Sequence, residues 1–427
     1  MEQKKGFDTI LLHEGYTPEE RTKSRAVPLY MTTAYAFDSA EHARSLFALE
    51  QEGNIYTRLQ NPTSDILEKR IAALEGGVGA LATSSGHAAE LMTILTLASC
   101  GDEIVSSSQI YGGSVNLFGK TLKKMGIKTH FVDPDDPGAF DRATNDRTKA
   151  YYVETVGNPN ANVADIEAIS NVAKKHGVPL IADSTMTTPY LIKPIELGAD
   201  IVIHSTTKYI SGNGTVMGGI AVDSGKFKWL GNPRFPEFNE PDPSYKGLVY
   251  AEALPETAFI AKIRSHIVRD VGACQSPFNS WITLLGMETL SLRMERHCKN
   301  ADIVADFLEN DPHIERVNYP RLKSSPYYEL SKRILPKGAG STFTFEIKGT
   351  RENGAKLIDS VKLISHVTNL GDSRSLISHP ASTTHSQLSD EQLKAAGISP
   401  TTIRISVGLE TVEDLLEDLR QALKAAF

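Results

Sequence analysis

Short apolar runs alternate with longer amphipathic runs between residues 79 and 222 of this chain. The short runs are bounded by glycine, proline or polar residues, which predicts strands in GALATSS, DEIVSSS, KTHFV, AYYVET, PLIADS, DIVIHS and GGIAV. Several of the segments between them have the apolar spacing of helices that pack on a sheet by one face, as in HAAELMTILTLAS, SVNLFGKTLKKMG and DIEAISNVAKKHG. This alternation predicts an α/β fold with a mostly parallel sheet, whose ligand lies beyond the carboxyl ends of the strands.

Two regions flank this core, and they suggest the domain organisation. Residues 1–60 carry turns and tyrosines but little periodicity, so we expect an arm there, followed by a large domain over 61–262 and a smaller α+β domain over 263–427. Residues 231–250 form a proline-rich, aromatic insertion without periodicity, and long irregular segments of this kind are usually functional or disordered. Helical patterning breaks at Ser276-Pro277 and then continues through WITLLGMETLSLRMERHCKNADIVADFLEN.

Composition narrows the class of protein. Of the 427 residues, 40% are apolar and 23% are charged, as in an ordinary globular chain. The net charge is 45 − 52 = −7 with no basic block, which makes nucleic acid an unfavoured partner. The three cysteines are widely spaced and lack a metal-ligand pattern, so we expect neither a disulfide framework nor a metal site. No stretch has the length and hydrophobicity of a membrane span or a signal peptide, and we expect a cytoplasmic protein that binds no membrane.

One lysine carries the first candidate chemistry. Lys208 lies in HSTTKYISGNG, directly after the apolar run DIVIH, where a loop leaves the carboxyl edge of the predicted sheet. An amine that attacks a carbonyl must be partly deprotonated, which burial or a neighbouring positive charge can arrange. A lysine in isolation is more often a solvated surface charge. The residues that accompany it therefore decide between the two interpretations.

Asp183 ends the run PLIADS, so a carboxylate is expected at the same edge as the lysine. A buried carboxylate needs a cationic partner, and the protonated nitrogen of pyridoxal phosphate is such a partner. The segment ATSSGHAAE places Ser85 and Gly86 at a strand-to-helix junction suited to a phosphate, and Ser205 and Thr207 add hydroxyl groups. Capping and turn chemistry would use the same residue types.

Two further side chains suit a planar cofactor and an amino-acid substrate. Tyr111 follows the strand DEIVSSS and could stack on a ring, although an interfacial tyrosine is the alternative. An α-carboxylate needs a planar pair of donors, which arginine supplies. Arg404 alternates with apolar residues in TTIRISVGLE, and a solvent-facing strand arginine would show the same pattern.

These features together resemble the Cys/Met-metabolism enzymes that use pyridoxal 5′-phosphate. The similarity extends over nearly the whole chain, in the order VPLYMTTAYAF, GNIYTRLQNPTSDILEKRIAALEGG, SSGHAA, YGG, ETVGNP, IADST, HSTTKYISGNG, SLRMERH, HPASTTHSQLS and TIRISVGLE. The resemblance implies the aspartate aminotransferase-like, type I fold, with a seven-stranded, mostly parallel sheet in the large cofactor domain and a smaller C-terminal α+β domain.

The resemblance also implies roles for individual residues. Lys208 would hold the cofactor covalently and act in catalysis, Asp183 would pair with the ring nitrogen, and Tyr111 would stack and act as an acid or base. The phosphate and its surroundings would involve Ser85, Gly86, His87, Ser205 and Thr207, together with Tyr56 and Arg58 of a neighbouring subunit. Substrate and ring contacts would come from Arg404, Asn158, Asn369, Leu370 and Tyr56. No metal is implied.

Within the family, the proline-rich insertion resembles that of the O-acetylhomoserine sulfhydrylases. Methionine γ-lyases tend to have cysteine where this chain has Gly113, and several relatives have methionine in place of His87. The resemblance implies a γ-replacement that converts O-acetyl-L-homoserine and sulfide, or another sulfur donor, into L-homocysteine and acetate for methionine biosynthesis, in a homo-oligomer and most simply a tetramer. The alternatives are O-succinylhomoserine sulfhydrylation, cystathionine γ-synthesis and methionine γ-lysis. A non-catalytic protein that binds pyridoxal phosphate is the alternative from another class.

Overall fold

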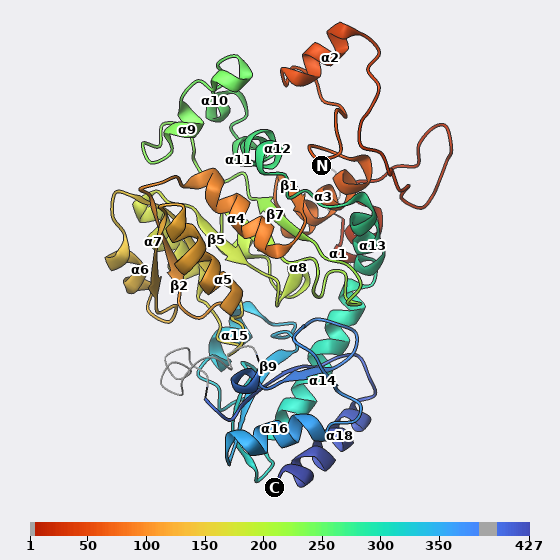
Figure 1. Cartoon of the computed structure of the whole chain (residues 1–427), viewed down its shortest axis with the longest axis vertical. Coiled ribbons are helices and arrows are strands. Elements are labelled where there is room, and N and C mark those ends of the chain that lie inside the picture. Colours follow the sequence, from red (N-terminus) through yellow and green to blue (C-terminus); the bar gives the residue numbers. More distant parts are fainter. Residues whose placement is uncertain (1–4, 384–398) are drawn as a thin grey trace.

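The chain folds around two β-sheets that lie one beyond the other along its longest axis (Figure 1). The computed structural model describes residues 5–383 and 399–427. The motif HPASTTHSQLS therefore lies only partly within the described residues. The amino-terminal arm with α2 (Ala40–Phe47) extends from one end of the molecule, and the carboxyl-terminal helix α18 (Val412–Ala426) lies at the other end.

The larger sheet has seven strands in the order β1-β7-β6-β5-β4-β2-β3. β7 pairs antiparallel with both of its neighbours, and the other pairs are parallel. Each strand coincides with one of the seven runs predicted from the sequence, so the predicted mostly parallel sheet is confirmed. The strands are β1 (Gly79–Thr83), β2 (Glu103–Ser107), β3 (Lys128–Val132), β4 (Thr148–Glu154), β5 (Leu180–Asp183), β6 (Ile201–His204) and β7 (Gly219–Asp223).

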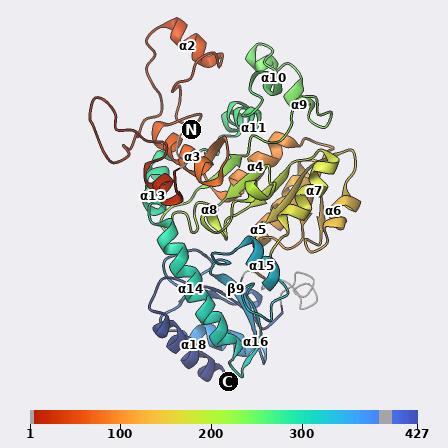
Figure 2. The same cartoon turned by 180° about the vertical axis from the view of Figure 1, so that it is seen from behind.

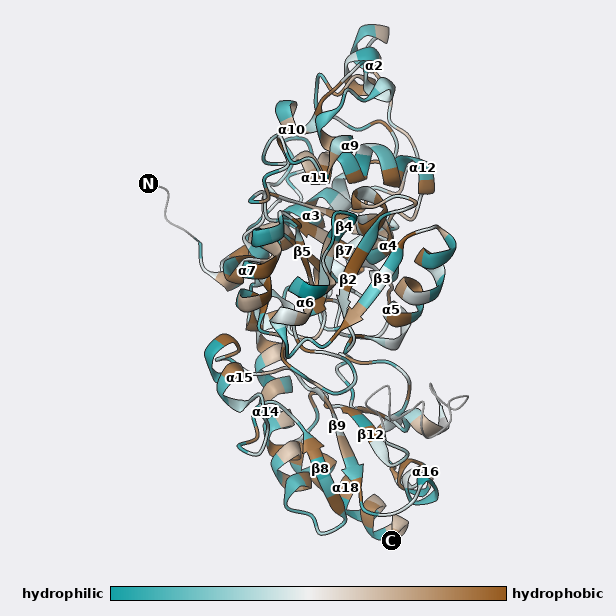
Figure 3. Ribbon diagram, turned by 90° about the vertical axis from the view of Figure 1, so that its left-hand side faces the viewer, coloured by the Kyte–Doolittle hydropathy of each residue, from teal (hydrophilic) through white to brown (hydrophobic). Residues whose placement is uncertain are grey.

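Successive residues of these strands supply two apolar cores, one on each face of the sheet. In β4, Tyr151 and Val153 belong to one buried cluster, whereas Ala150 and Tyr152 belong to the other. This alternation follows from the two-residue period of a strand, and burial of both faces explains why the inner strands are largely apolar. The edge strand β3 (KTHFV) has no buried residue. Figure 3 shows hydrophobic residues along the strands of this sheet.

Helices cover both faces of the larger sheet. α4 (Gly86–Leu97) packs on β6 and β7, and α7 (Ile166–His176) packs on β4 and β5. α5 (Gly112–Asn116) continues directly into the π-helix η1 (Leu117–Leu122), where one helix was predicted. The remaining elements of this part are α1 (Phe7–His13), α3 (Pro62–Glu75), α6 (Pro137–Ala143), α8 (Thr188–Leu191), η2 (Pro194–Leu197), α11 (Ala258–Lys262), η4 (Ile263–Val268), α12 (Arg269–Val271) and α13 (Pro277–Met287).

The arm and the insertion contain more structure than their lack of periodicity indicated. α1 contacts α3 and buries Leu11. The insertion folds into α9 (Pro236–Asn239), η3 (Pro243–Tyr245) and α10 (Tyr250–Ala253) around Trp229, whose ring stacks on Phe238 at a centroid distance of 4.3 Å. Buried aromatic area stabilises such a segment without any repeating pattern. The role of the insertion stays open.

The smaller sheet has five strands in the order β10-β11-β12-β9-β8, and α14 (Leu290–Glu309) runs from the larger sheet to it (Figures 1 and 2). The predicted helical run over 281–310 is interrupted at Glu288 and Thr289, between α13 and α14. The smaller unit comprises β8 (Ile314–Asn318), α15 (Tyr328–Ile334), β9 (Thr342–Ile347), α16 (Arg351–Ser360), β10 (Ser365–His366), β11 (Leu376–Ser378), η5 (Pro380–Ser382), β12 (Thr402–Ser406) and α18. The domain limits stay a prediction. In the described ranges we find no helix with the length and apolar content needed to cross a bilayer.

Candidate active site

A cavity of about 230 Å³ lies at the carboxyl ends of the parallel strands. Tyr111 follows β2, Glu154 ends β4, Asp183 ends β5, and Lys208 follows β6, so neighbouring strands deliver these groups to one edge. The cavity is lined by Ser85, Gly86, His87, Glu90, Tyr111, Glu154, Asn158, Asp183, Thr185, Met186, Ser205, Thr207, Lys208, Met217, Thr368, Asn369, Leu370 and Arg404. The structure thus brings together every predicted site residue except Tyr56 and Arg58.

Lys208 presents its amine inside this cavity. Its Nζ donates a hydrogen bond of 2.5 Å to Oδ1 of Asn369, in the loop before β11. Burial, together with the positive charge of Arg404, lowers the pKa of Lys208 from its usual value to about 8. About a tenth of the amine is therefore unprotonated at pH 7, and this is the form that attacks a carbonyl.

The turn after Lys208 is held by an arginine from α14. The Arg293 guanidinium donates to the carbonyl oxygens of Tyr209 at 2.6 Å and of Ile210 at 3.1 Å. Gly212 has a positive φ of 71°, and a Cβ there would lie 2.0 Å from the same guanidinium. The turn needs glycine for both its backbone conformation and this close approach. The helix that leads to the smaller sheet thereby fixes the position of the lysine.

Asp183 lies buried at the end of β5, with 8% of its surface exposed. Its Oδ1 accepts the backbone N–H of Thr185 at 2.8 Å, and the Tyr152 hydroxyl lies 3.4 Å from its Oδ2. Burial raises the pKa of Asp183 above its ordinary value. A cationic partner in the cavity would offset the cost of this buried charge.

The amino terminus of α4 forms the opposite end of the cavity. Ser85 caps the helix by accepting the N–H of Ala88 at 3.1 Å, and the first N–H groups of a helix lack intrahelical partners. A Cβ on Gly86 would lie 2.7 Å from the Cβ of Ser205, so glycine permits the close approach of these two segments. This end combines backbone N–H groups with hydroxyl groups and suits a phosphate. Thr207, which also lines it, exchanges hydrogen bonds with the backbone of Gly218.

Tyr111 lies at the mouth of the cavity with 45% of its surface exposed, and the His87 ring meets it edge-on at a centroid distance of 5.5 Å. A Cβ on Gly113 would lie 2.4 Å from the Tyr111 ring and 2.7 Å from the His87 ring. The absence of a side chain at Gly113 therefore makes room for both rings. The side chain of His87 contacts Tyr111. His87 would therefore offer its backbone N–H, rather than its side chain, to the end of the cavity that suits a phosphate.

Arg404 crosses from β12 of the smaller sheet into the same cavity. Its guanidinium donates to the Oδ1 of Asn158 at 3.4 Å and to the carbonyl oxygen of Asn369 at 3.1 Å. Burial lowers the pKa of this guanidinium. The arginine is therefore not the solvated strand residue of the alternative interpretation. Leu370 is 5% exposed beside it and supplies an apolar wall.

Tyr56 and Arg58 lie elsewhere in this chain. Tyr56 is 41% exposed on the arm, and the Arg58 guanidinium packs over its ring at 5.4 Å and donates to the carbonyl oxygen of Arg269. Neither residue lines the cavity. Their predicted contribution to the site of a neighbouring subunit stays a prediction.

Comparison with known proteins identifies the family. The sequence model of the Cys/Met metabolism PLP-dependent enzymes matches residues 8–424. The chain belongs to this family. It is 52% identical to the O-acetyl-L-homoserine sulfhydrylase of Leptospira meyeri, over 98% of this chain and 96% of that protein. It is 48% identical to the homocysteine synthase of Schizosaccharomyces pombe, over 98% of each chain.

A solved structure shares the whole fold. The chain superposes with a TM-score of 0.95 on a Campylobacter jejuni protein assigned as an O-acetylhomoserine (thiol)-lyase and described with N′-pyridoxyl-lysine-5′-monophosphate. The two sequences are 43% identical, and the match covers 98% of this chain and 99% of that one. The predicted type I fold and the predicted dependence on pyridoxal phosphate are confirmed.

The residues of this member of the family fit the cofactor. The cavity offers a buried amine for the aldehyde, a buried carboxylate for the ring nitrogen, and a helix terminus with hydroxyl groups for the phosphate. One oxygen of Glu90, which lines the cavity, is buried without a hydrogen-bond partner in the described part of the chain. Lys208, Asp183 and the Ser85–Gly86 junction would hold the group. Bound there, pyridoxal phosphate would supply a sink for the electron pair left when Cα of an amino acid loses its proton.

Sequence reasoning missed two buried carboxyl groups in this family member's cavity. Glu154 accepts the backbone N–H of Tyr111 at 2.7 Å and that of Asn158 at 2.9 Å, so it positions both residues. Burial and the neighbouring Asp183 raise its pKa well above the usual value. Glu90 lies in α4, where its carboxyl group is the one charged group that interrupts the buried face of the helix. That interruption was the signal in the sequence.

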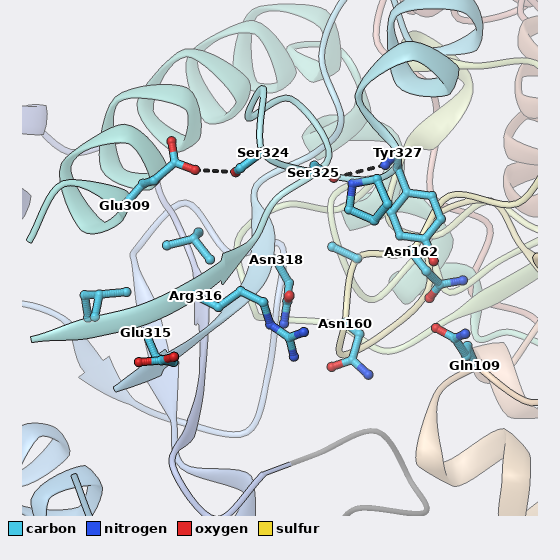
Figure 4. Close-up of a pocket in the computed structure, with 14 residues that line it drawn as sticks. Gln109, Asn160, Asn162, Glu309, Glu315, Arg316, Asn318, Ser324, Ser325 and Tyr327 are labelled. Carbon is cyan, nitrogen blue, oxygen red and sulfur yellow. Dashed lines mark hydrogen bonds between the residues drawn. The ribbon is translucent and has the colours of Figure 1, made fainter. Parts of the chain in front are cut away.

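A second cavity lies on another side of this family member, between β8 and the loop after β4 (Figure 4). Its volume is about 500 Å³, and the amides of Gln109, Asn160 and Asn162 line it together with Arg316. Among the residues that the structure describes, its lining includes neither a lysine nor a histidine. Of these two cavities, the smaller one around Lys208 has the groups that covalent and acid–base chemistry require.

Proposed function

We propose that this enzyme catalyses the γ-replacement that converts O-acetyl-L-homoserine and sulfide into L-homocysteine and acetate. The single observation that carries the proposal is the joint presence, in one cavity, of the Lys208 amine and the Arg404 guanidinium. The similarity to relatives named O-acetyl-L-homoserine sulfhydrylase and homocysteine synthase supports the choice of substrate.

The proposed work of each residue follows from its chemistry. Arg404 binds the α-carboxylate of the substrate and fixes its orientation, with Asn158 and Asn369 holding the guanidinium. Lys208, whose pKa lies near 8, takes the proton from Cα and returns it at the end of the cycle. With the cofactor bound, Asp183 would hold the ring nitrogen and stabilise its protonated form.

The bond changes balance without an external oxidant or reductant. Loss of a Cβ proton accompanies departure of acetate from Cγ, and hydrosulfide then forms the new bond at Cγ while the protons return to Cβ and Cα. We propose that the hydroxyl group of Tyr111, which lines the cavity and is partly exposed, lies close to Cγ of the substrate. There it donates a proton to the departing acetate or accepts one from the entering hydrosulfide. Leu370 and Asn369 line the substrate side.

We further propose a homo-oligomer, most simply a tetramer, in which Tyr56 and Arg58 of each arm reach the phosphate site of a neighbouring subunit. The exposed position of Tyr56 and the extension of the arm away from the sheets support this arrangement (Figure 1). We propose the cytoplasm as the location, where reducing conditions keep Cys100, Cys274 and Cys298 as free thiols.

The test is a substrate profile of the purified holoenzyme. O-Acetyl- and O-succinylhomoserine are each incubated with and without sulfide, and the amino-acid product is identified. We expect homocysteine from the acetyl ester and sulfide. Preference for the succinyl ester, formation of cystathionine from cysteine, or cleavage of methionine would replace the proposal with the corresponding family activity. Cofactor binding without turnover of any of these substrates would indicate the non-catalytic alternative.

A further inference from the structure

Glu90 lines the cofactor cavity from the first turns of α4 and has no role in the mechanism above. Its carboxyl group is 4% exposed, and its Oε1 accepts hydrogen bonds from the Ser114 hydroxyl at 2.8 Å and the Tyr152 hydroxyl at 3.0 Å. Its Oε2 is equally buried but finds no hydrogen-bond partner among the described residues. A buried carboxyl oxygen without a partner is costly, which points to a partner that occupies the cavity.

The Tyr152 hydroxyl links Glu90 to Asp183. It lies 3.0 Å from Oε1 of Glu90 and 3.4 Å from Oδ2 of Asp183, so two carboxyl groups share one hydroxyl donor. Both carboxyl groups therefore belong to the wall that the ring nitrogen would face. Asp183 alone has been given a role there, and Glu90 is the second carboxyl group of that wall.

The charges around Glu90 determine its state of protonation in the empty cavity. Asp183 on β5 is the negative charge that acts on Glu90, and Glu154 on β4 lines the same cavity with a raised pKa. The cations Lys208 and Arg404 also line the cavity, as do His87 and Tyr111. Burial, and then the charge of Asp183, raise the pKa of Glu90 to about 8, although the hydrogen bonds from Ser114 and Tyr152 act in the opposite direction. At neutral pH the empty cavity therefore holds Glu90 as the neutral acid.

We propose that Glu90 is a positioning residue for the cofactor ring and that it loses its proton when the ring binds. Like the function above, this inference depends on the ring nitrogen lying against Asp183. A protonated ring nitrogen brings a positive charge to this wall, which offsets the repulsion between the two carboxyl groups. Glu90 then ionises and its proton passes to solvent. The carboxylates of Glu90 and Asp183 together fix the position of the ring.

The sign of the pH dependence follows from this exchange. Below pH 8 the empty protein must release the Glu90 proton to bind the ring, so the affinity for pyridoxal phosphate rises with pH. Because one proton is involved, Glu90 contributes up to about a tenfold gain in affinity per pH unit, until the gain levels off near its pKa in the empty cavity. Lys208 and the ring itself also titrate, but they contribute equally to any variant that leaves them unchanged.

The experiment compares the full-length holoenzyme with its Glu90→Gln variant. Each is dialysed against graded pyridoxal phosphate between pH 6 and about pH 10, and the lysine-bound cofactor is measured by its absorbance. Glutamine keeps an acceptor for Ser114 and Tyr152 but cannot titrate. We expect the logarithm of the dissociation constant to depend on pH more steeply in the natural protein than in the variant, by up to about one unit per pH unit. Equal slopes overturn the inference.

A second variant tests the same group without removing it. Ser114→Ala deletes a hydrogen bond that favours the charged form of Glu90, so the affinity should level off at a higher pH than in the natural protein. An unchanged levelling point overturns the inference even if Glu90→Gln fails to retain cofactor. The exposed Glu240, replaced by Gln, is the matched control and should leave the slope unchanged. Absence of any cofactor on Lys208 in the natural protein would instead overturn the proposed function.

Discussion

Gly86 allows a quantitative test of how closely the two segments proposed to bind the phosphate pack against each other. A Cβ at this position would lie 2.7 Å from Cβ of Ser205 and 3.1 Å from both its Cα and its Oγ. Ser205 cannot easily retreat, because its N–H donates to the Thr185 hydroxyl at 2.8 Å. In the variant Gly86→Ala we therefore expect the junction between β1 and α4 to be overpacked.

The magnitude follows from two opposing contributions. Overpacking of this kind costs about 1–3 kcal/mol. Replacing glycine by alanine at a compatible backbone position restores about 0.4–1 kcal/mol by restricting the unfolded chain. For a chain of 427 residues the unfolding entropy is about 0.9 kcal/mol per kelvin, so the overpacking alone lowers the melting temperature by roughly 1–3 °C. Gly119→Ala, where the nearest atom lies at an ordinary contact distance of 3.5 Å from Phe131, is the control without overlap.

A double-mutant cycle separates the overlap from other effects. Thermal unfolding is followed by intrinsic fluorescence for Gly86→Ala, Ser205→Gly and the double variant. Since Ser205→Gly removes the Cβ at 2.7 Å, we expect the alanine to become nearly neutral in that background, with a coupling of about 1–3 kcal/mol. An alanine effect that is the same in both backgrounds would refute the close approach of these segments.

Three further predictions concern the chemistry. Attachment of pyridoxal phosphate to Lys208 in the cofactor-free protein should accelerate with rising pH and level off near pH 8, because the pKa of the amine is lowered; a rate still rising at pH 10 would contradict this. Arg404→Lys should raise KM for the amino-acid substrate roughly 10- to 100-fold, because a charged hydrogen bond is lost, and the cofactor absorbance should be retained. An unchanged KM would show that Arg404 does not bind the substrate carboxylate. Tyr111→Phe should lower kcat by about a hundredfold or more, and full turnover would end its assignment to proton transfer.

Much of the fold could be predicted because its determinants are local. All seven strands of the larger sheet coincide with runs predicted from the sequence. The inner strands are largely apolar because both of their faces are buried, whereas the edge strand β3 has the sequence KTHFV and no buried residue. Lys208 and Asp183 were expected to share one edge for a related reason. Both follow the carboxyl ends of parallel strands, and β5 and β6 are direct neighbours in the sheet.

Segments stabilised by contacts without a period were predicted less well. The insertion at 231–250 looked irregular, yet Phe235, Phe238 and Tyr250 bury their rings around Trp229. The helical run over 281–310 is broken at Glu288 and Thr289, where neither glycine nor proline marks the break. Aromatic burial and a change of direction between two packed helices leave no repeating pattern in the sequence.

The sequence alone indicated the candidate groups: an amine and a carboxylate at neighbouring strand ends, a helix terminus suited to a phosphate, and an arginine within a strand. Only the tertiary structure decided which other buried side chains contact these candidate groups. Arg293 reaches the lysine turn from α14, and Glu90 meets Asp183 through Tyr152 because α4 packs on the face of the sheet that carries both. Local sequence patterns specify the spacing of apolar residues in helices and strands and the positions of turns. The contacts of Arg293 and Glu90 depend on the order of the strands and the placement of the helices, which no local pattern specifies.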